Sequence, residues 1–395
     1  MEQAVILAAR RTPIGSFGGN LRELSPAALG AAAIRAALSS AQVEPANLDD
    51  VILGCVLQAG AGMNVARQAA VQAGVPVDVP AETVNRVCGS GLQAVVHAAE
   101  AIRGGFARMI VAGGTESMSR APYLLPAARW GMRMGHGETV DAMLADGLVC
   151  AVAGCHMGMT AEEVASRFDV SRAEQDAFAA ESQRRAAVAQ GSGLFGEEII
   201  PIDAPRPRGA VARVERDEPP RPDTTAEALA GLRPAFIPDG TVTAGNASGI
   251  ADGAAALVVS AESQARSEGR RPLARILSFA TTGIDPMIMG MGPVAAVRRA
   301  VDRAGITLNH IDLFEINEAF AAQAVAVMRQ LDLDPGRVNV HGGAVALGHP
   351  IGASGARILV TLVHALRARG GGYGVAALCI GGGQGIAAVI EANRD

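Results

Sequence analysis

Residues 88–114 read CGSGLQAVVHAAEAIRGGFARMIVAGG, and residues 352–383 read GASGARILVTLVHALRARGGGYGVAALCIGGG. Each stretch opens on small residues, continues as an Ala-rich amphipathic segment that stops at adjacent glycines, and ends on an apolar run followed by glycines. The first stretch predicts a helix over 91–103 and a strand over 109–112, and the second predicts a helix followed by a strand over 375–379. Two copies of one helix–strand unit indicate an internal duplication.

The rest of the chain alternates in the same way. Apolar runs at residues 1–9, 51–57 and 311–316 predict strands, and amphipathic segments at residues 26–39 and 294–304 predict helices. This alternation predicts an α/β fold.

The chain of 395 residues is too long for one small core. Between the two copies lies a segment of different character, with a polar helix predicted near residues 171–189 and a Pro/Arg-rich stretch after it. Long irregular segments in compact proteins are usually lids or binding loops. We therefore expect an inserted loop domain at 118–249, an N-terminal half at 1–117 plus 250–271, and a C-terminal half at 272–395.

The composition excludes several functions. Apolar residues make up 49% of the chain, but no uninterrupted apolar run reaches the roughly 18 residues of a membrane-spanning helix. The formal charge is -5 without blocks of like charge, which argues against a nucleic-acid partner. All 34 basic residues are Arg, which excludes a usual P-loop, a pyridoxal-phosphate Schiff base and a lysine nucleophile.

The expected location is the cytoplasm. Arg10 and Arg11 follow the first apolar run instead of preceding it, which is the wrong order for a secretory signal. The five cysteines are an odd number scattered over the chain, and this suits reduced thiols better than a disulfide framework.

Cys88 is the first candidate nucleophile, predicted in the first turn of a helix that follows a strand. A helix N-terminus carries free amides and partial positive charge, which lower a thiol pKa and can hold an oxyanion. A cysteine among small residues is otherwise a buried hydrophobe. We interpret the flanking Gly89 and Gly91 as positions where the backbone comes close to a substrate.

Three further residues carry possible chemistry. His349 precedes Pro350 in a glycine-rich loop and could accept a proton near neutral pH. Cys379 ends a predicted strand before a glycine loop, where a structural and a functional role stay equally open. Asn317 begins a predicted helix, where it is either an N-cap or an amide that orients water.

A metal site is not expected. Cys150, Cys155 and His156 lie close together in the sequence, but their spacing matches no zinc signature and a fourth ligand is missing nearby. We expect them to have a packing role.

These motifs, in this order, resemble the thiolase family: NRVCGSG from Asn85, NEAF from Asn317, GHP at His349 and CIGGGQG from Cys379. The similarity runs over essentially the whole chain and includes RTPIGSF from Arg11 and GTVTAGNASG from Gly240. The resemblance implies a duplicated α-β-α-β-α layered fold with a loop domain over the entrance.

By this resemblance, Cys88 takes an acyl group from one thioester, His349 activates it, and Cys379 exchanges a proton with the methyl group of a second acetyl-CoA. Asn317 would fix a water that shares the enolate oxygen with His349, and the amides of Cys88 and Gly381 would hold the oxyanion of acyl transfer. The implied reaction is the reversible condensation of two acetyl-CoA to acetoacetyl-CoA and CoA, with CoA thioesters as substrates and no metal or other cofactor.

The resemblance also places the CoA channel and the subunit contacts. The segment CHMG from Cys155 and the residue Met289 resemble the short-chain type, whereas Ala228 stands where that type has a Ser. Residues 123–140 resemble the loop that joins two dimers into a homotetramer, with a plain dimer as the other expectation. The implied channel residues are His156, Arg221, Ser248, Met289, Ala319 and Phe320.

Three other functions are considered as alternatives to this reaction. A β-ketoacyl synthase shares the implied fold but lacks a catalytic cysteine in the terminal glycine loop, so Cys379 speaks against it. A degradative 3-ketoacyl-CoA thiolase for longer chains keeps all four motifs. A catalytically inactive CoA-binding relative would be expected to have lost at least one motif, and none is broken here.

Overall fold

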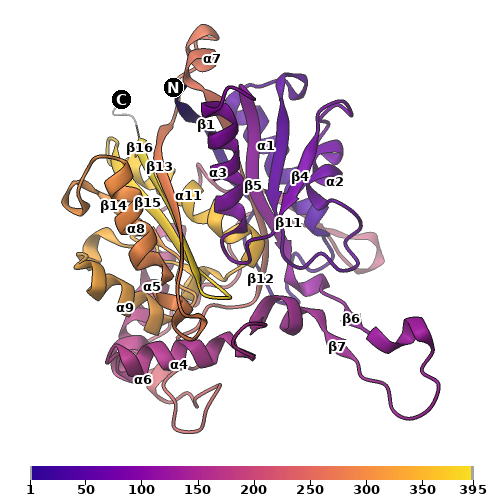
Figure 1. Ribbon diagram of the computed structural model, residues 1–395, viewed down its shortest axis with the longest axis vertical. Coiled ribbons are helices and arrows are strands. Elements are labelled where there is room, and N and C mark those ends of the chain that lie inside the picture. The colour runs from indigo at the N-terminus through magenta and orange to yellow at the C-terminus, as the bar shows by residue number, and fades with distance from the viewer. Residues whose placement is uncertain (1, 393–395) are drawn as a thin grey trace.

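Two half-sheets with the same strand order form the centre of the computed structural model, which describes residues 2–392 (Figure 1). The first half-sheet runs β4-β3-β5-β12-β1 and the second runs β14-β15-β16-β13, and β1 joins β13 at one edge of each. In each half the first two equivalent strands, β3 and β5 or β14 and β15, are parallel, and the next two are antiparallel. The predicted α/β duplication is therefore confirmed.

The strands have the following bounds: β1 Ala4–Arg11, β2 Gly15–Ser16, β3 Asp50–Gly54, β4 Ala81–Val84, β5 Met109–Ser117, β12 Ala251–Ala261, β13 Ala274–Gly283, β14 Leu313–Ile316, β15 Gly372–Ile380 and β16 Gln384–Ala392. The helices of the two halves are α1 Pro26–Ala41, α2 Val65–Gln72, α3 Ser90–Arg103, α7 Glu262–Ser267, α8 Gly292–Arg303, α9 Ala321–Leu331, α10 Ala344–Leu347 and α11 Ile351–Ala368.

Helices and half-sheets alternate in five layers (Figure 1). The helices α3 and α11 lie between the half-sheets, and their apolar side chains form one core with the inner faces of both. The helices α1 and α2 cover the outer face of the first half-sheet, and α8 and α9 cover that of the second. Both predicted helix–strand units thus meet in the central layer.

The glycines at the start of α3 and α11 serve helix packing. A Cβ on Gly91 would lie 2.7 Å from the amide nitrogen of Ala356, and a Cβ on Gly355 would lie 2.3 Å from that of Leu92. A Cβ on Gly89 would lie 2.5 Å from Cδ1 of Ile380. The interpretation that Gly89 and Gly91 bring the backbone to a substrate was therefore wrong, because the space beside them is filled by α11 and β15.

Most predicted elements are present with shifted ends. The strand predicted at 1–9 is β1, which runs on to Arg11, while Met1 lies outside the described residues. The strand predicted at 51–57 stops at Gly54, because the amides of Val56 and Leu57 turn to donate to the Glu116 carboxylate at 3.0 and 3.1 Å. The strand predicted at 109–112 continues to Ser117 as β5.

The segment between β5 and β12 covers one end of both halves. It contains α4 Met157–Arg167, α5 Arg172–Gly191, α6 Ala226–Ala230 and short strand pairs, β6 Tyr123–Leu124 with β7 Val140–Asp141, β8 Val149–Cys150 with β9 Cys155–His156, and β10 Ile202–Pro205 with β11 Val211–Val214. The predicted polar helix is α5, which Ser171 caps with a capping box. The exact limits of the three predicted domains stay predictions.

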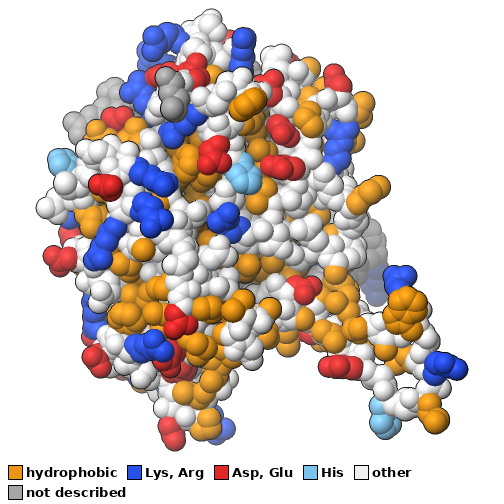
Figure 2. Space-filling view, viewed as in Figure 1, with side chains coloured by type: hydrophobic (Ala, Val, Ile, Leu, Met, Phe, Trp, Pro, Cys, Tyr) orange, Lys and Arg blue, Asp and Glu red, His pale blue; other side chains and the backbone are white. Residues whose placement is uncertain are grey.

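The pair β6 and β7 carries an arm that projects from the body of the molecule (Figure 1). Large apolar side chains are exposed on it, among them Trp130 at 82% and Met134 at 95% (Figure 2). In the described chain, none of the helices combines the length and the apolar character needed to cross a membrane.

Candidate active site

Cys88 lies in a tight turn between β4 and α3. The helix begins at Ser90, so Cys88 precedes the helix instead of lying in its first turn as predicted. The Ser90 hydroxyl donates to the Val87 carbonyl at 2.6 Å and accepts from the Arg86 amide at 2.8 Å. Val87 has a φ of +45°, which a β-branched residue rarely adopts, and such strained positions concentrate at functional sites.

The surroundings of the Cys88 thiol decide its protonation. Withdrawal from bulk water raises the pKa of Cys88 to about 11, while the backbone amides of Gly381 and of Cys88 itself act in the opposite direction. These are the two amides that the resemblance assigns to the oxyanion. A thiol with this pKa is neutral at pH 7 and needs a base in order to attack a thioester.

His349 lies in the turn between α10 and α11 and is buried. Its Nδ1 lies 2.5 Å from the Ser354 hydroxyl, which itself donates to the Pro350 carbonyl at 2.9 Å. Because the Ser354 hydroxyl donates its proton to the Pro350 carbonyl, its oxygen can only accept a hydrogen bond from the Nδ1–H of His349. The Nε2 of His349 is therefore unprotonated. Burial, followed by the charge of Arg357, lowers the pKa of His349 to about 3, so the imidazole is neutral above that pH.

Asn317 faces His349 and is not a helix cap. Its Nδ2 lies 3.5 Å from His349 Nε2, an arrangement in which the amide donates to the bare nitrogen. The helix α9 begins at Ala321 with Phe320 as its N-cap, so the N-cap alternative was wrong. Within residues 2–392 the buried Oδ1 of Asn317 has no hydrogen-bond partner, which leaves it free to hold a water.

Cys379 lies inside β15, one residue before the strand ends at Ile380, and is fully buried. Burial, followed by the neighbouring Cys88, raises its pKa. The following glycines form the hairpin turn into β16, in which Ile380 pairs with Gln384. Gly383 has a φ of +85°, and a Cβ there would lie 2.2 Å from the Ile284 carbonyl oxygen, so the turn requires glycine at this position.

One cavity of about 370 Å³ brings most of the predicted residues together. Its wall is largely apolar, and it includes residues that the sequence did not single out, such as Met157, Phe236 and Ile351. Met157 could have been found from its place in the CHMG motif. The predicted residues in its lining are Cys88, His156, Ser248, Met289, Ala319, Phe320, His349 and Cys379.

A second cavity of about 490 Å³ adjoins the first, and both share Ala244, Ala247, Gly249 and Ile250. Arg221 lines this outer cavity together with Glu218 and two prolines. The two cavities therefore form a path from a polar entrance to the buried thiols. Asn317 and Gly381 are not in the lining and reach it through His349 and Cys88.

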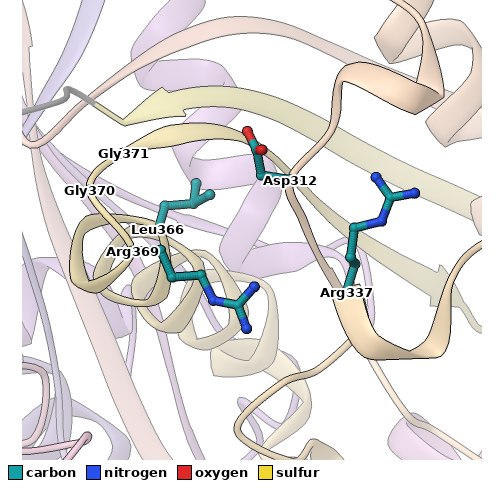
Figure 3. A pocket seen from close by; sticks show the side chains of 6 residues that line it. All are labelled: Asp312, Arg337, Leu366, Arg369, Gly370 and Gly371. Atoms are coloured by element: carbon teal, nitrogen blue, oxygen red, sulfur yellow. The ribbon is translucent and has the colours of Figure 1, made fainter.

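Other candidate sites lack this chemistry. A hollow of about 460 Å³ near the end of α11 is lined by Asp312, Arg337, Arg369 and neighbouring apolar or glycine residues (Figure 3), so its described lining holds no thiol or imidazole. Across the described ranges, no group of three His, Cys, Asp or Glu side chains could hold a metal ion. Cys150 and Cys155 oppose each other in the β8–β9 hairpin.

Ser354→Ala should slow acylation of Cys88 by roughly tenfold, the usual effect of losing one hydrogen bond. Without the hydroxyl, His349 can take the Nε2–H tautomer, which cannot accept the thiol proton. The rate of acetyl transfer from acetyl-CoA to Cys88 measures this. Ser278→Ala is the control, since it removes a buried hydroxyl that donates to the Ala300 carbonyl away from His349. Equal rates for both variants would contradict the assigned tautomer.

Known proteins resemble the chain over its full length. Residues 4–263 match the family model described as thiolase, N-terminal domain, and residues 270–392 match thiolase, C-terminal domain. The chain is 56% identical over 392 residues to an acetyl-CoA acetyltransferase of Escherichia coli and 55% identical over 390 residues to one of Pseudomonas aeruginosa, with 99% of each chain covered.

Solved structures agree with this. The acetyl-CoA acetyltransferase of Bacillus anthracis superposes with a TM-score of 0.97 at 47% identity, and human mitochondrial 3-ketoacyl-CoA thiolase with a TM-score of 0.96 at 44% identity. Each match covers 99% of both chains.

Proposed function

The chain belongs to the thiolase family, and from this premise we propose that it is an acetyl-CoA C-acetyltransferase that condenses two acetyl-CoA reversibly to acetoacetyl-CoA and CoA. The observation that carries the proposal is the cavity that holds Cys88, His349 and Cys379 in one apolar wall. Its continuation into a second, more polar cavity suits a substrate with a small acyl end and a long polar handle.

In the first half of the reaction, the Cys88 sulfur attacks the carbonyl carbon of an acetyl thioester. His349 Nε2 takes the thiol proton and returns it to the sulfur of the departing CoA, which leaves acetyl-Cys88. The negative charge on the carbonyl oxygen during this step is held by the amides of Cys88 and Gly381, the same two amides that act to lower the pKa of the Cys88 thiol.

In the second half, the Cys379 thiol gives its proton to His349 Nε2, and the resulting thiolate removes a proton from the methyl group of a second acetyl-CoA. The enolate oxygen is held by the Nε2–H of His349, which carries the Cys379 proton at this stage, and by a water on Asn317, whose free Oδ1 and 3.5 Å approach to His349 support this role. The enolate carbon attacks the acetyl group, the Cys88–acyl bond breaks, His349 Nε2 gives its proton to the departing Cys88 sulfur, and acetoacetyl-CoA leaves. Thiolysis follows the same steps backward.

The CoA portion is proposed to occupy the outer cavity. Arg221 supplies a cation there for the phosphorylated end, and Ser248, His156 and Phe320 line the narrower passage toward the thiols. Ala228 is exposed on α6, whose Leu229 lines the same cavity, so this position offers CoA no polar side chain. The proposal requires no metal or other cofactor, since CoA thioesters are the substrates.

Thiolysis of 3-ketoacyl-CoAs of increasing chain length, with free CoA as the second substrate, tests the proposal. Activity is expected on acetoacetyl-CoA and is expected to fall by roughly tenfold or more per added two-carbon unit, because the apolar wall around Met289 and Met157 is closely packed. The loss of enolate absorbance follows the reaction. Equal or better activity on longer chains would identify a general 3-ketoacyl-CoA thiolase, and none at all would identify a binding protein.

We further propose a homotetramer that acts in fatty acid metabolism in the cytoplasm. The exposed arm with Trp130 and Met134 supports self-association, because apolar side chains of this size are costly to leave in water (Figure 2). A plain dimer is the alternative assembly, and light scattering of the purified protein distinguishes the two.

A further inference from the structure

Arg11, the last residue of β1, is fully buried outside the reaction cavity. Its guanidinium makes two parallel bonds to Asp217, from Nη1 at 2.7 Å and from Nη2 at 2.8 Å, and its Nε donates to Glu198 at 2.7 Å. Both carboxylates come from the segment that covers the two halves. A buried ion pair is weak as a source of stability but rigid in geometry, so this arrangement fixes where the covering segment sits.

Asp217 begins the stretch that forms one wall of the outer cavity. Its Oδ1 also accepts from the Ile14 amide at 2.8 Å, and the next residue, Glu218, donates its own amide to the Ile14 carbonyl at 2.9 Å. The Glu218 carboxylate accepts from the amides of Ser16 at 3.0 Å and Asn20 at 2.9 Å. The chain is thereby fastened along the loop that follows β1.

Only Pro219 and Pro220 separate Glu218 from Arg221. Proline fixes φ, so a displacement at Asp217 or Glu218 is carried to Arg221 instead of being absorbed in between. The Arg221 amide donates to Gln183 Oε1 at 2.7 Å, which holds the far end of the stretch. All four residues from Glu218 to Arg221 line the outer cavity.

We propose that Arg11 is a positioning residue for CoA recognition. Through Asp217 it sets the wall formed by residues 218–221, and thereby the place of the Arg221 cation relative to the phosphorylated nucleotide part of CoA. This inference rests on the proposed function. It assigns Arg11 no part in the chemistry, which takes place in the inner cavity.

The test compares a full and a truncated substrate. Arg11→Lys keeps the charge but loses the parallel bonds, and Asp217→Asn keeps the size of the side chain but loses its charge. With acetoacetyl-CoA and CoA, both variants are expected to raise KM by about tenfold or more while kcat stays within about threefold. With acetoacetyl-pantetheine and pantetheine, which lack the nucleotide, kcat/KM is expected to equal that of the wild type.

The control is Arg10→Lys. Arg10 is the adjacent, partly exposed arginine, which donates to the Glu197 carbonyl and to Ser40. The kinetics of this variant should not change.

A double-mutant cycle adds a second readout. If Arg11 acts through Arg221, then Arg11→Lys should add no further loss of CoA affinity to Arg221→Gln. Should Arg11→Lys fail to fold, Asp217→Asn carries the test.

Equal losses on both substrates, a fall in kcat alone, or additive losses in the cycle would overturn the positioning role of Arg11. Unchanged KM for CoA in folded variants would overturn it as well. A wild-type protein without any thiolysis of acetoacetyl-CoA would instead contradict the proposed function, so the two failures are distinguishable.

Discussion

Cys88→Ala is expected to lose turnover by on the order of 10⁶-fold, as removal of a covalent nucleophile does elsewhere. The alanine methyl group cannot form a thioester, so the amides of Cys88 and Gly381 have no acyl group to act on. Both acetyl-enzyme formation and thiolysis should therefore vanish together. Intact mass spectrometry after incubation with acetyl-CoA measures the first, and the enolate absorbance assay measures the second.

Cys155→Ala is the matched control for this variant. Cys155 is a half-buried thiol like Cys88 but lies outside the cavity lining, with its sulfur 4.0 Å from that of Met287. Its replacement should leave acetylation and turnover within a few-fold of the wild type. An acetylated Cys88→Ala protein would show that a different residue receives the acyl group.

Cys379→Ala is expected to separate the two half-reactions. Acetyl transfer to Cys88 should persist, because the base for that step is His349 and the oxyanion amides remain in place. Condensation and thiolysis should fall by roughly 10²- to 10⁴-fold, the usual effect of removing a general acid–base group. The measurement is the mass gain of one acetyl group in the variant together with its loss of turnover.

Two further variants distinguish the loss of proton transfer from the loss of side-chain packing as the cause of this result. Cys379→Ser nearly keeps the volume of the side chain, but the serine hydroxyl is a weaker proton donor than the thiol. If Cys379 acts by proton transfer, this variant should behave like Cys379→Ala. If Cys379 acts only by packing, it should behave like the wild type. Cys55→Ala is the matched control, because Cys55 is fully buried like Cys379 but has no proposed role in the reaction. This variant should retain turnover. Normal turnover in Cys379→Ala would mean that the two-cysteine mechanism is wrong.

Much of the fold could be predicted because its signals are local. The helices α1, α3, α8 and α11 follow from apolar periodicity, and the strands β5 and β15 follow from short apolar runs. The repeated helix–strand unit predicted the duplication that the two half-sheets show. The ends of the strands were predicted less accurately. The end of β3, for example, is set by the carboxylate of Glu116, which lies far along the chain from β3.

The candidate site could be predicted only as a set of motifs. No distance between Cys88 and His349 follows from the sequence, because the two residues belong to different halves. An N-cap role for Asn317 was one of two predictions, because Asn favours that position in isolation. The helix begins later, at Ala321, and the Asn317 side chain turns instead toward His349.

The sequence by itself determined the α/β class, the duplication, the inserted segment and the family, because these depend on periodicity and on motifs that each lie within a short stretch. Only the tertiary structure decided that Gly91 and Gly355 join two helices, that Ser354 sets the tautomer of His349, and that Arg11 meets Asp217. These contacts join residues from separate elements, and they depend on side-chain packing and strand pairing that no local pattern encodes.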